Sequence, residues 1–104
     1  MPVDPASKIR TLPELKLLLH SARERGLKIA FANGCFDLIH VGHVRYLQGA
    51  RARGDILVVA LNSDASVRAI KGPRRPLQDE AARAEMIASM QFVDYVVIFD
   101  DPRF

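Results

Sequence analysis

Two histidines, His40 and His43, stand three positions apart in the sequence, with Gly42 between them. At the start of a helix this spacing projects both imidazoles from one face, where they can donate hydrogen bonds to a phosphate group. The glycine leaves the backbone open to close approach by a ligand. A surface pair and half of a metal site are the alternatives. Zinc needs three or four ligands, and the nearby Cys35 and Asp37 complete none of its usual spacing patterns, so we predict no protein-bound metal.

The residues before this pair have the form of a buried strand that runs into an anion-binding loop. Ile29 to Ala32 is apolar, as in a parallel strand covered on both faces, and Asn33-Gly34 ends the run. Loop N–H groups and the dipole of the following helix attract an anion, although the same pattern is common in α/β proteins of other function. Cys35 is expected to pack as a small apolar residue, because its neighbours Gly34 and Phe36 supply no base that would make it a nucleophile.

A basic segment without acidic residues runs from Ala65 to Gln78. Such a cluster attracts phosphate, and a solvated basic loop is the alternative. Nucleic-acid binding is not expected, because the segment lacks interleaved aromatic residues for stacking. One glycine and two prolines after Lys71 indicate an irregular loop over the site, of the kind that closes on a ligand. The basic residues of the segment are Arg68, Lys71, Arg74 and Arg75.

The elements that position these residues alternate between strand and helix. Apolar, β-branched runs predict strands near 28–33, 55–62 and 94–99. Helices are predicted at about 12–25, from the histidine pair toward Gly54, as a short turn at 65–70, and at about 79–90. A strand, a helix and a strand within about 35 residues predict a right-handed βαβ unit. The fold class is therefore α/β, a Rossmann-like three-layer sandwich with a parallel sheet.

Spacing along each helix predicts which residues face the core. In the first helix, a capping box from Thr11 to Glu14 precedes the apolar stripe, and His20 is expected to be an exposed bystander. Ligands of parallel sheets collect at the carboxyl ends of the strands, so Asn33–Asp37 and Asn62–Asp64 are expected to line one crevice. The predicted core-facing residues are Leu12, Leu15, Leu18, Leu19 and Ala22, then Val44, Leu47 and Ala50, then Ala82, Met86, Ile87 and Met90.

Composition places the chain among cytoplasmic proteins with one domain. The 104 residues are 49% hydrophobic and 26% charged, which suits a single core over 1–104, with 1–10 expected to be flexible. No apolar run approaches the roughly 18 residues of a membrane span, and the N-terminus lacks the form of a signal peptide. A single cysteine agrees with a reducing compartment. We therefore predict a cytoplasmic protein that binds no membrane.

The motifs at 33–37 and 40–43 together resemble a known signature. Asn-Gly-Cys-Phe-Asp followed by His-Val-Gly-His is similar to the HxGH nucleotidyltransferase superfamily of cytidylyltransferases and adenylyltransferases. Within it, the chain looks most like the heptose 1-phosphate adenylyltransferases that make ADP-heptose. The residues that carry this closer resemblance are Cys35, Asn62-Ser63-Asp64, Ser66-Val67, Lys71-Gly72, Arg75-Pro76 and Val93-Asp94.

The resemblance implies transfer of AMP from ATP to a sugar 1-phosphate, heptose 1-phosphate, with release of pyrophosphate. It implies that His40, His43 and Lys71 are catalytic, and that magnesium accompanies the ATP. It also implies substrate contacts by Asp37, Asp64, Lys71 and Arg83. For three of these, other roles remain open: Asp37 and Asp64 can order the site, Asp64 can instead cap the next helical turn, and Arg83 can be a solvated helix residue. The nucleotide-binding residues that it implies are Asn33, Gly34, Cys35, Phe36, His40, Gly42 and His43.

The resemblance also indicates that the C-terminal part of the family fold is absent from the 104 residues. Family members continue with a further strand and a helix whose Ser/Thr-rich motif holds the nucleotide phosphates. An uncovered sheet edge would favour association with another copy of the chain, a homo-oligomer, or with the missing part. Two alternatives to the adenylyltransferase therefore stay open, a cytidylyltransferase acting on glycerol 3-phosphate or a related phosphate, and a fragment that binds nucleotide without turnover.

Overall fold

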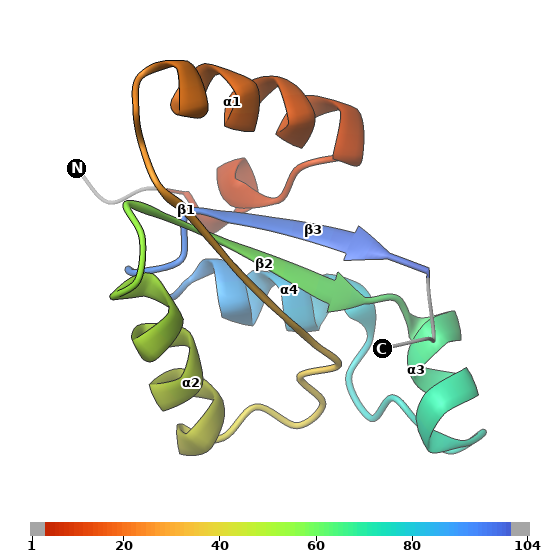
Figure 1. Cartoon of the computed structure of the whole chain (residues 1–104). Coiled ribbons are helices and arrows are strands. Elements are labelled where there is room, and N and C mark those ends of the chain that lie inside the picture. Colours follow the sequence, from red (N-terminus) through yellow and green to blue (C-terminus); the bar gives the residue numbers. More distant parts are fainter. Residues whose placement is uncertain (1–3, 101–104) are drawn as a thin grey trace.

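A computed structural model describes residues 4–100 of the chain as alternating helices and strands around one sheet (Figure 1). Their order confirms the α/β class predicted from the sequence. The elements are η1 (Pro5–Lys8), α1 (Leu12–Glu24), β1 (Ile29–Gly34), α2 (Val41–Arg51), β2 (Ile56–Asn62), α3 (Asp64–Lys71), α4 (Glu80–Ala88) and β3 (Tyr95–Phe99).

The sheet of three strands is parallel throughout, in the order β1-β2-β3. Phe31 of β1 is paired with Val58, and Val59 of β2 is paired with Val96. Strands that are parallel place all their carboxyl ends at one edge of the sheet. The predicted strand positions agree with the observed bounds to within one residue at each end.

Helices cover both faces of this sheet, as Figure 1 shows, with α1 on one face and α2 and α4 on the other. Successive residues of β2 point to opposite faces: Val58 packs with Leu15 and Leu19 of α1, whereas Leu57 and Val59 pack in the cluster on the other face. The arrangement is a three-layer sandwich of Rossmann-like type, as predicted. The second cluster is centred on Leu47, Leu57, Val59, Leu61, Ala84, Ile87, Val93 and Val96.

The helices begin at residues whose side chains accept hydrogen bonds from the first backbone N–H groups. Thr11 and Glu14 form the predicted capping box at α1, and Gly26, with φ of +77°, follows the end of that helix. Ser63 caps α3 by accepting a hydrogen bond from the Ser66 N–H. Asp64 is the first residue of that helix, so the alternative that Asp64 is the cap is wrong. Ser63 is an equally suitable cap, because its hydroxyl can accept the hydrogen bond that an aspartate carboxylate would accept at that position.

Several buried faces differ from the predicted ones. Leu12, the first residue of α1, is 54% exposed, and Met86 of α4 is 40% exposed. The face of α4 that is buried contains Arg83, Ala84, Ile87 and Ala88. Of these, Ile87 was predicted to face the core and is fully buried, whereas periodicity missed Arg83 because a buried arginine has no apolar signature. His20 is exposed, as predicted.

The segment expected to be flexible contains a helix that the sequence did not predict. Pro5–Lys8 form η1, and its Asp4 cap accepts a hydrogen bond from the Ala6 N–H. Ile9 then bridges to Val96 of β3, and the Arg10 N–H donates to the Val96 carbonyl at 2.8 Å. These contacts attach the segment to the sheet from Ile9 onward. Residues 1–3 of the expected flexible segment lie outside the described part of the chain.

An apolar groove of about 300 Å³ remains between α1 and the sheet. Phe31, on the edge strand β1, is 58% exposed beside it. This edge strand therefore presents apolar surface beside the groove. The other residues that line the groove are Leu12, Leu15, Lys16, Leu19, Val58, Ala60, Val97, Ile98 and Phe99.

Candidate active site

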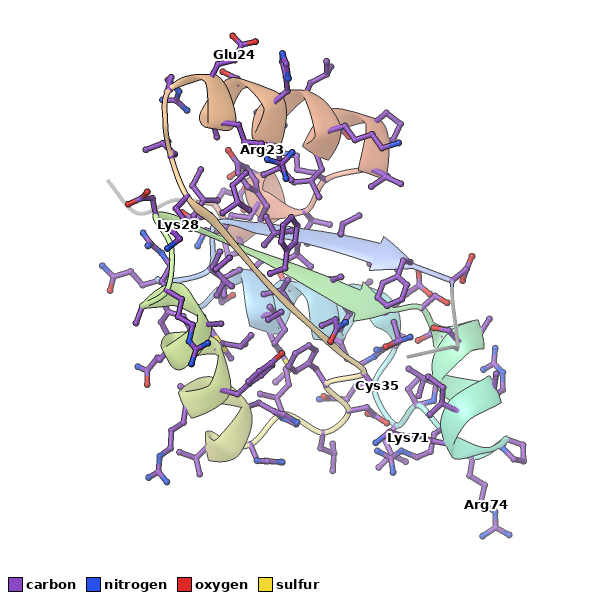
Figure 2. The ribbon with its side chains drawn as sticks, in the orientation of Figure 1. Arg23, Glu24, Lys28, Cys35, Lys71 and Arg74 are labelled. Carbon is purple, nitrogen blue, oxygen red and sulfur yellow. The ribbon has the colours of Figure 1, made fainter. Side chains whose placement is uncertain are left out.

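A cleft of about 510 Å³ opens beyond the carboxyl end of β1. It lies between the loop after β1, the start of α2 and the end of α3, where Figure 2 shows Cys35 and Lys71. Asn62, Ser63 and Asp64 do not line it, so the prediction that both strand ends form its wall is wrong in part; the far end of α3 and the basic loop supply that wall. The lining residues are Asn33, Gly34, Cys35, Phe36, Asp37, Leu38, His40, His43, Tyr46, Ile70, Lys71 and Arg75.

The two histidines are oriented by the backbone at the start of α2. His40 is the N-cap, and its Nδ1 accepts a hydrogen bond from the Gly42 N–H at 3.1 Å. His43 Nδ1 accepts in turn from the His40 N–H at 3.2 Å, and the rings stack with centroids 3.9 Å apart. A neutral imidazole that accepts at Nδ1 carries its proton at Nε2. Both rings can therefore donate from Nε2 to an anion in the cleft.

Gly42 makes room for this arrangement. A Cβ at position 42 would lie 2.8 Å from Cε1 and 3.0 Å from Nδ1 of His40. Those distances are shorter than van der Waals contact, so a larger residue would displace the imidazole. The space beside Gly42, where the sequence predicted close approach of a ligand, is thus occupied by the His40 ring.

Phe36 lines the cleft beside His43. Its ring is buried and meets that of His43 edge to face, with centroids 5.2 Å apart. Its φ of +51° lies in the left-handed region, which a bulky residue rarely adopts. A Cβ at Gly34 would come within 3.0 Å of this ring. The Gly34-Cys35-Phe36 turn therefore depends on the glycine for its packing.

The electrostatic environment of His43 favours the neutral imidazole. Burial, then the neighbouring His40 and then the ammonium of Lys71 lower the pKa of His43 below its ordinary value of 6.5. Lys71 is exposed at the end of α3 and lines the same cleft. The structure thus places in one cleft the three residues that the family resemblance implied to be catalytic.

Asp37 holds the basic loop rather than facing solvent. Its buried carboxylate accepts hydrogen bonds from Arg75 Nε at 2.7 Å, from the Leu77 N–H at 2.8 Å and from the Gln78 N–H at 3.1 Å. Burial alone would raise the pKa of Asp37, but these donors outweigh it and lower that pKa below its ordinary value of 3.8. Of the two roles left open for Asp37, these contacts favour ordering the site.

Arg83 is fully buried behind the loop after β1 and does not line the cleft. Its Nη1 donates to the Cys35 carbonyl at 2.7 Å and the Asn62 carbonyl at 2.8 Å, and its Nη2 donates to Asp64 Oδ1 at 2.8 Å. Nε donates to the Gln78 carbonyl. The alternative of a solvated Arg83 is therefore wrong. In this structure Arg83 and Asp64 join the loops from behind.

Cys35 packs at the wall of the cleft as a partly buried side chain. Its Sγ lies 3.7 Å from Asn62 Oδ1, a long contact typical of a weak thiol donor. Asn62 Nδ2 in turn donates to Ser66 Oγ. This polar chain links the ends of β1 and β2, which agrees with a packing role for Cys35.

Sequence reasoning did not single out four residues of the cleft wall. Tyr46 follows His43 by three positions on α2, a helical spacing that could have indicated it. Arg75 was named in the basic segment and in the family resemblance, but it was given no role in the site. Leu38 and Ile70 carry no chemical signal in a sequence, and the fold alone brings them to the cleft.

Within residues 4–100, no group of three or more histidine, cysteine, aspartate or glutamate side chains is placed to hold a metal ion. Asp37 is the only carboxylate among the described residues that line the cleft, and both of its oxygens accept hydrogen bonds. Magnesium therefore fits this site only when its ligands come mainly from nucleotide phosphates. None of the helices described between residues 4 and 100 combines the length and the apolar character that a membrane span requires.

Fold and site together define a nucleotidyltransferase-type domain. Residues 31–103 match the family described as cytidylyltransferase-like, and the chain belongs to that family. The resemblance that rests on the two motifs is thereby confirmed.

Individual relatives agree with this assignment. The chain is 56% identical over 98 residues to the bifunctional protein HldE of Geobacter metallireducens, covering 94% of this chain and 20% of that protein. It is 58% identical over 88 residues to the HldE of Nitrobacter hamburgensis, covering 85% and 18%. The chain thus spans about a fifth of the length of these relatives. A crystal structure of the lipopolysaccharide core biosynthesis protein from Thermoplasma volcanium superposes with a TM-score of 0.68 at 29% identity, covering 75% of this chain and 62% of that one.

Proposed function

We propose that the chain is an adenylyltransferase domain that transfers AMP from ATP to heptose 1-phosphate and releases pyrophosphate. The observation that carries the proposal is the stacked pair His40 and His43, each held with Nδ1 on a backbone N–H, in a cleft that also contains Lys71. Such a pair presents two donors to a phosphoryl group. The sugar phosphate is proposed from the motif resemblance, and the structural neighbour's role in lipopolysaccharide core biosynthesis supports it.

In the proposed reaction a phosphate oxygen of the sugar 1-phosphate attacks the α-phosphorus of ATP in line. The bond from the α-phosphorus to its bridging oxygen breaks, and pyrophosphate leaves with the electron pair. The protein contributes position and charge stabilisation to such a step rather than a covalent intermediate. Nε2–H groups of His40 and His43 donate to the oxygens that gain charge, and loop residues Asn33 to Phe36 hold the nucleotide beside them.

Lys71 contacts phosphate in this proposal because it is exposed at the cleft and basic. For Asp37, Asp64 and Arg83 we propose positioning roles in place of the direct substrate contacts that the family resemblance implied. All three are engaged by protein groups behind or beside the cleft. Magnesium enters with ATP and neutralises phosphate charge when bound.

We further propose that the protein acts in the cytoplasm and associates with a second copy. ATP and sugar phosphates are soluble substrates, and the exposed Phe31 beside the apolar groove supports self-association. Sizing in solution at several protein concentrations tests the second proposal, and a monomer at all concentrations would contradict it.

A pyrophosphate-release assay tests the reaction. ATP and CTP are each combined with heptose 1-phosphate and with glycerol 3-phosphate. Release with ATP and heptose 1-phosphate only is the expected result. Turnover only with CTP and glycerol 3-phosphate would support the cytidylyltransferase, and nucleotide binding without turnover of any pair would support the binding-only alternative.

A further inference from the structure

Arg75 belongs both to the loop over the cleft and to the wall of the cleft. Its side chain is 30% exposed and lies among the lining residues together with Lys71, His40 and His43. Neither the histidine motif nor the roles proposed above use it. A guanidinium placed among histidines and a lysine has the chemistry of an anion ligand.

Asp37 fixes how this guanidinium is presented. Arg75 Nε donates to the Asp37 carboxylate at 2.7 Å, and Nη2 donates to the Asp37 carbonyl oxygen. Nη1 makes no hydrogen bond to any group within residues 4–100. Two of the three nitrogens therefore hold the plane of the group, and the third remains for a ligand. A planar group held in this way loses less conformational entropy when it binds.

The ion pair with Asp37 leaves positive charge at the cleft. The carboxylate shares its charge with the Leu77 and Gln78 N–H groups as well as with Arg75. No second carboxylate lines the cleft among the described residues, whereas Lys71 adds another positive charge there. An anion entering the cleft thus meets two cations, one of which is pre-oriented.

We propose that Arg75 is a phosphate-binding residue of this cleft, oriented by Asp37. The proposal deepens the adenylyltransferase function above and rests on it. The phosphoryl group it takes belongs either to ATP or to the sugar 1-phosphate, which share the same chemistry. Arg74, the next residue, is exposed and points outward at the periphery in Figure 2, and it does not line the cleft. It provides a matched control of equal charge.

Calorimetric binding of ATP with magnesium and of heptose 1-phosphate, each to the whole chain, tests the proposal. Arg75→Gln is expected to weaken one of the two by about tenfold or more, since a hydrogen bond to a charged group is lost, while Arg74→Gln changes neither by more than about twofold. Asp37→Asn keeps the guanidinium and is expected to lose less affinity than Arg75→Gln. The probe whose affinity falls in Arg75→Gln carries the phosphoryl group that Arg75 binds.

Two results would overturn the proposal. The first is that Arg75→Gln binds both probes with affinities within about twofold of those of the unaltered protein. The second is that Asp37→Asn loses as much affinity as Arg75→Gln, which would show that Arg75 only holds the loop. Binding of neither probe to the unaltered protein would overturn it as well. If Arg75→Gln does not fold, Arg75→Lys decides, because it keeps the charge and loses the planar fork; unchanged affinity there would contradict the proposal. Failure of the proposed reaction alone would look different: the unaltered protein would bind both probes but form no product.

Discussion

Nη2 of Arg83 lies 2.8 Å from Oδ1 of Asp64, and this ion pair joins α4 to the start of α3 behind the cleft. The same guanidinium donates to the carbonyl groups of Cys35, the residue after β1, and of Asn62, the last residue of β2. One buried side chain therefore sets the spacing between the loop that leads to the histidines and the helix that carries Lys71. The distance between these two elements sets the width of the cleft.

Loss of this buried arginine should destabilise the fold. Arg83→Met leaves the Asp64 carboxylate and buried carbonyl groups without their donor, and we expect it to lower the free energy of unfolding by about 3 kcal/mol or more. Urea denaturation followed by circular dichroism measures the change. Arg68→Met, on the exposed side of α3, is the control and should stay within about 0.5 kcal/mol of the unaltered protein. A loss below about 1 kcal/mol in Arg83→Met would contradict this account of the network.

Substitution of Gly42 should separate site geometry from stability. In Gly42→Ala the new Cβ meets His40 Cε1 at 2.8 Å and displaces the ring from the helix start, so we expect adenylyl transfer to slow by about tenfold or more. Gly49→Ala on the same helix is the control, because no atom lies within 4 Å of its new Cβ. The control should gain about 0.5–1 kcal/mol of stability and keep its rate. Equal rates for both variants would show that His40 tolerates displacement.

The pKa of His43 should respond to Lys71. NMR titration of the imidazole is expected to give a value below 6.5 for the free protein, because burial, His40 and Lys71 all disfavour the cation. Folded protein then binds the proton less readily than unfolded protein, so this group lowers stability as the pH falls below 6.5. Lys71→Gln should raise the pKa of His43, and Arg74→Gln should leave it in place. A pKa above 6.5 in the free protein would contradict the described environment.

Asp37 should make the basic loop sensitive to acid. Its pKa in the folded chain lies below the ordinary 3.8, so the stability it contributes is complete above that value and is lost as the pH falls through the folded pKa. Hydrogen exchange at Leu77 and Gln78, whose N–H groups donate to this carboxylate, reports the loop. Asp37→Asn should increase exchange at both amides at neutral pH, while those of α1 stay protected. Unchanged protection at both amides would argue that other contacts hold the loop.

Much of the fold follows from patterns in the sequence. The three apolar runs placed β1, β2 and β3 to within a residue because strands covered on both faces need continuous apolar sequence. Thr11 and Glu14 marked the start of α1 through a capping box that the structure contains. Periodicity predicted the buried faces of helices less well. In α4 it placed Met86 in the core, whereas the structure buries Arg83 and leaves Met86 exposed.

For the site, the residues could be named from the sequence, but the contacts between them could not. The resemblance of the two motifs to a known family named His40, His43 and Lys71 as catalytic, and all three line the cleft. The use of Gly42 to seat the His40 ring, of Asp37 to hold the loop and of Arg83 to join two strand ends could not be derived, because each depends on residues far apart in the chain or on a side-chain rotamer. Long-range contacts of this kind have no local sequence signal.

The measurement that tests the central claim most directly is mass-spectrometric detection of ADP-heptose from ATP and heptose 1-phosphate. Unaltered protein is expected to form this product, His43→Ala to form it about 100-fold more slowly, since one transition-state donor is lost, and His20→Ala, which changes an exposed histidine of α1, to match the unaltered protein. Equal rates in the unaltered protein and His43→Ala would contradict the claim, as would the absence of ADP-heptose when CTP and glycerol 3-phosphate do react.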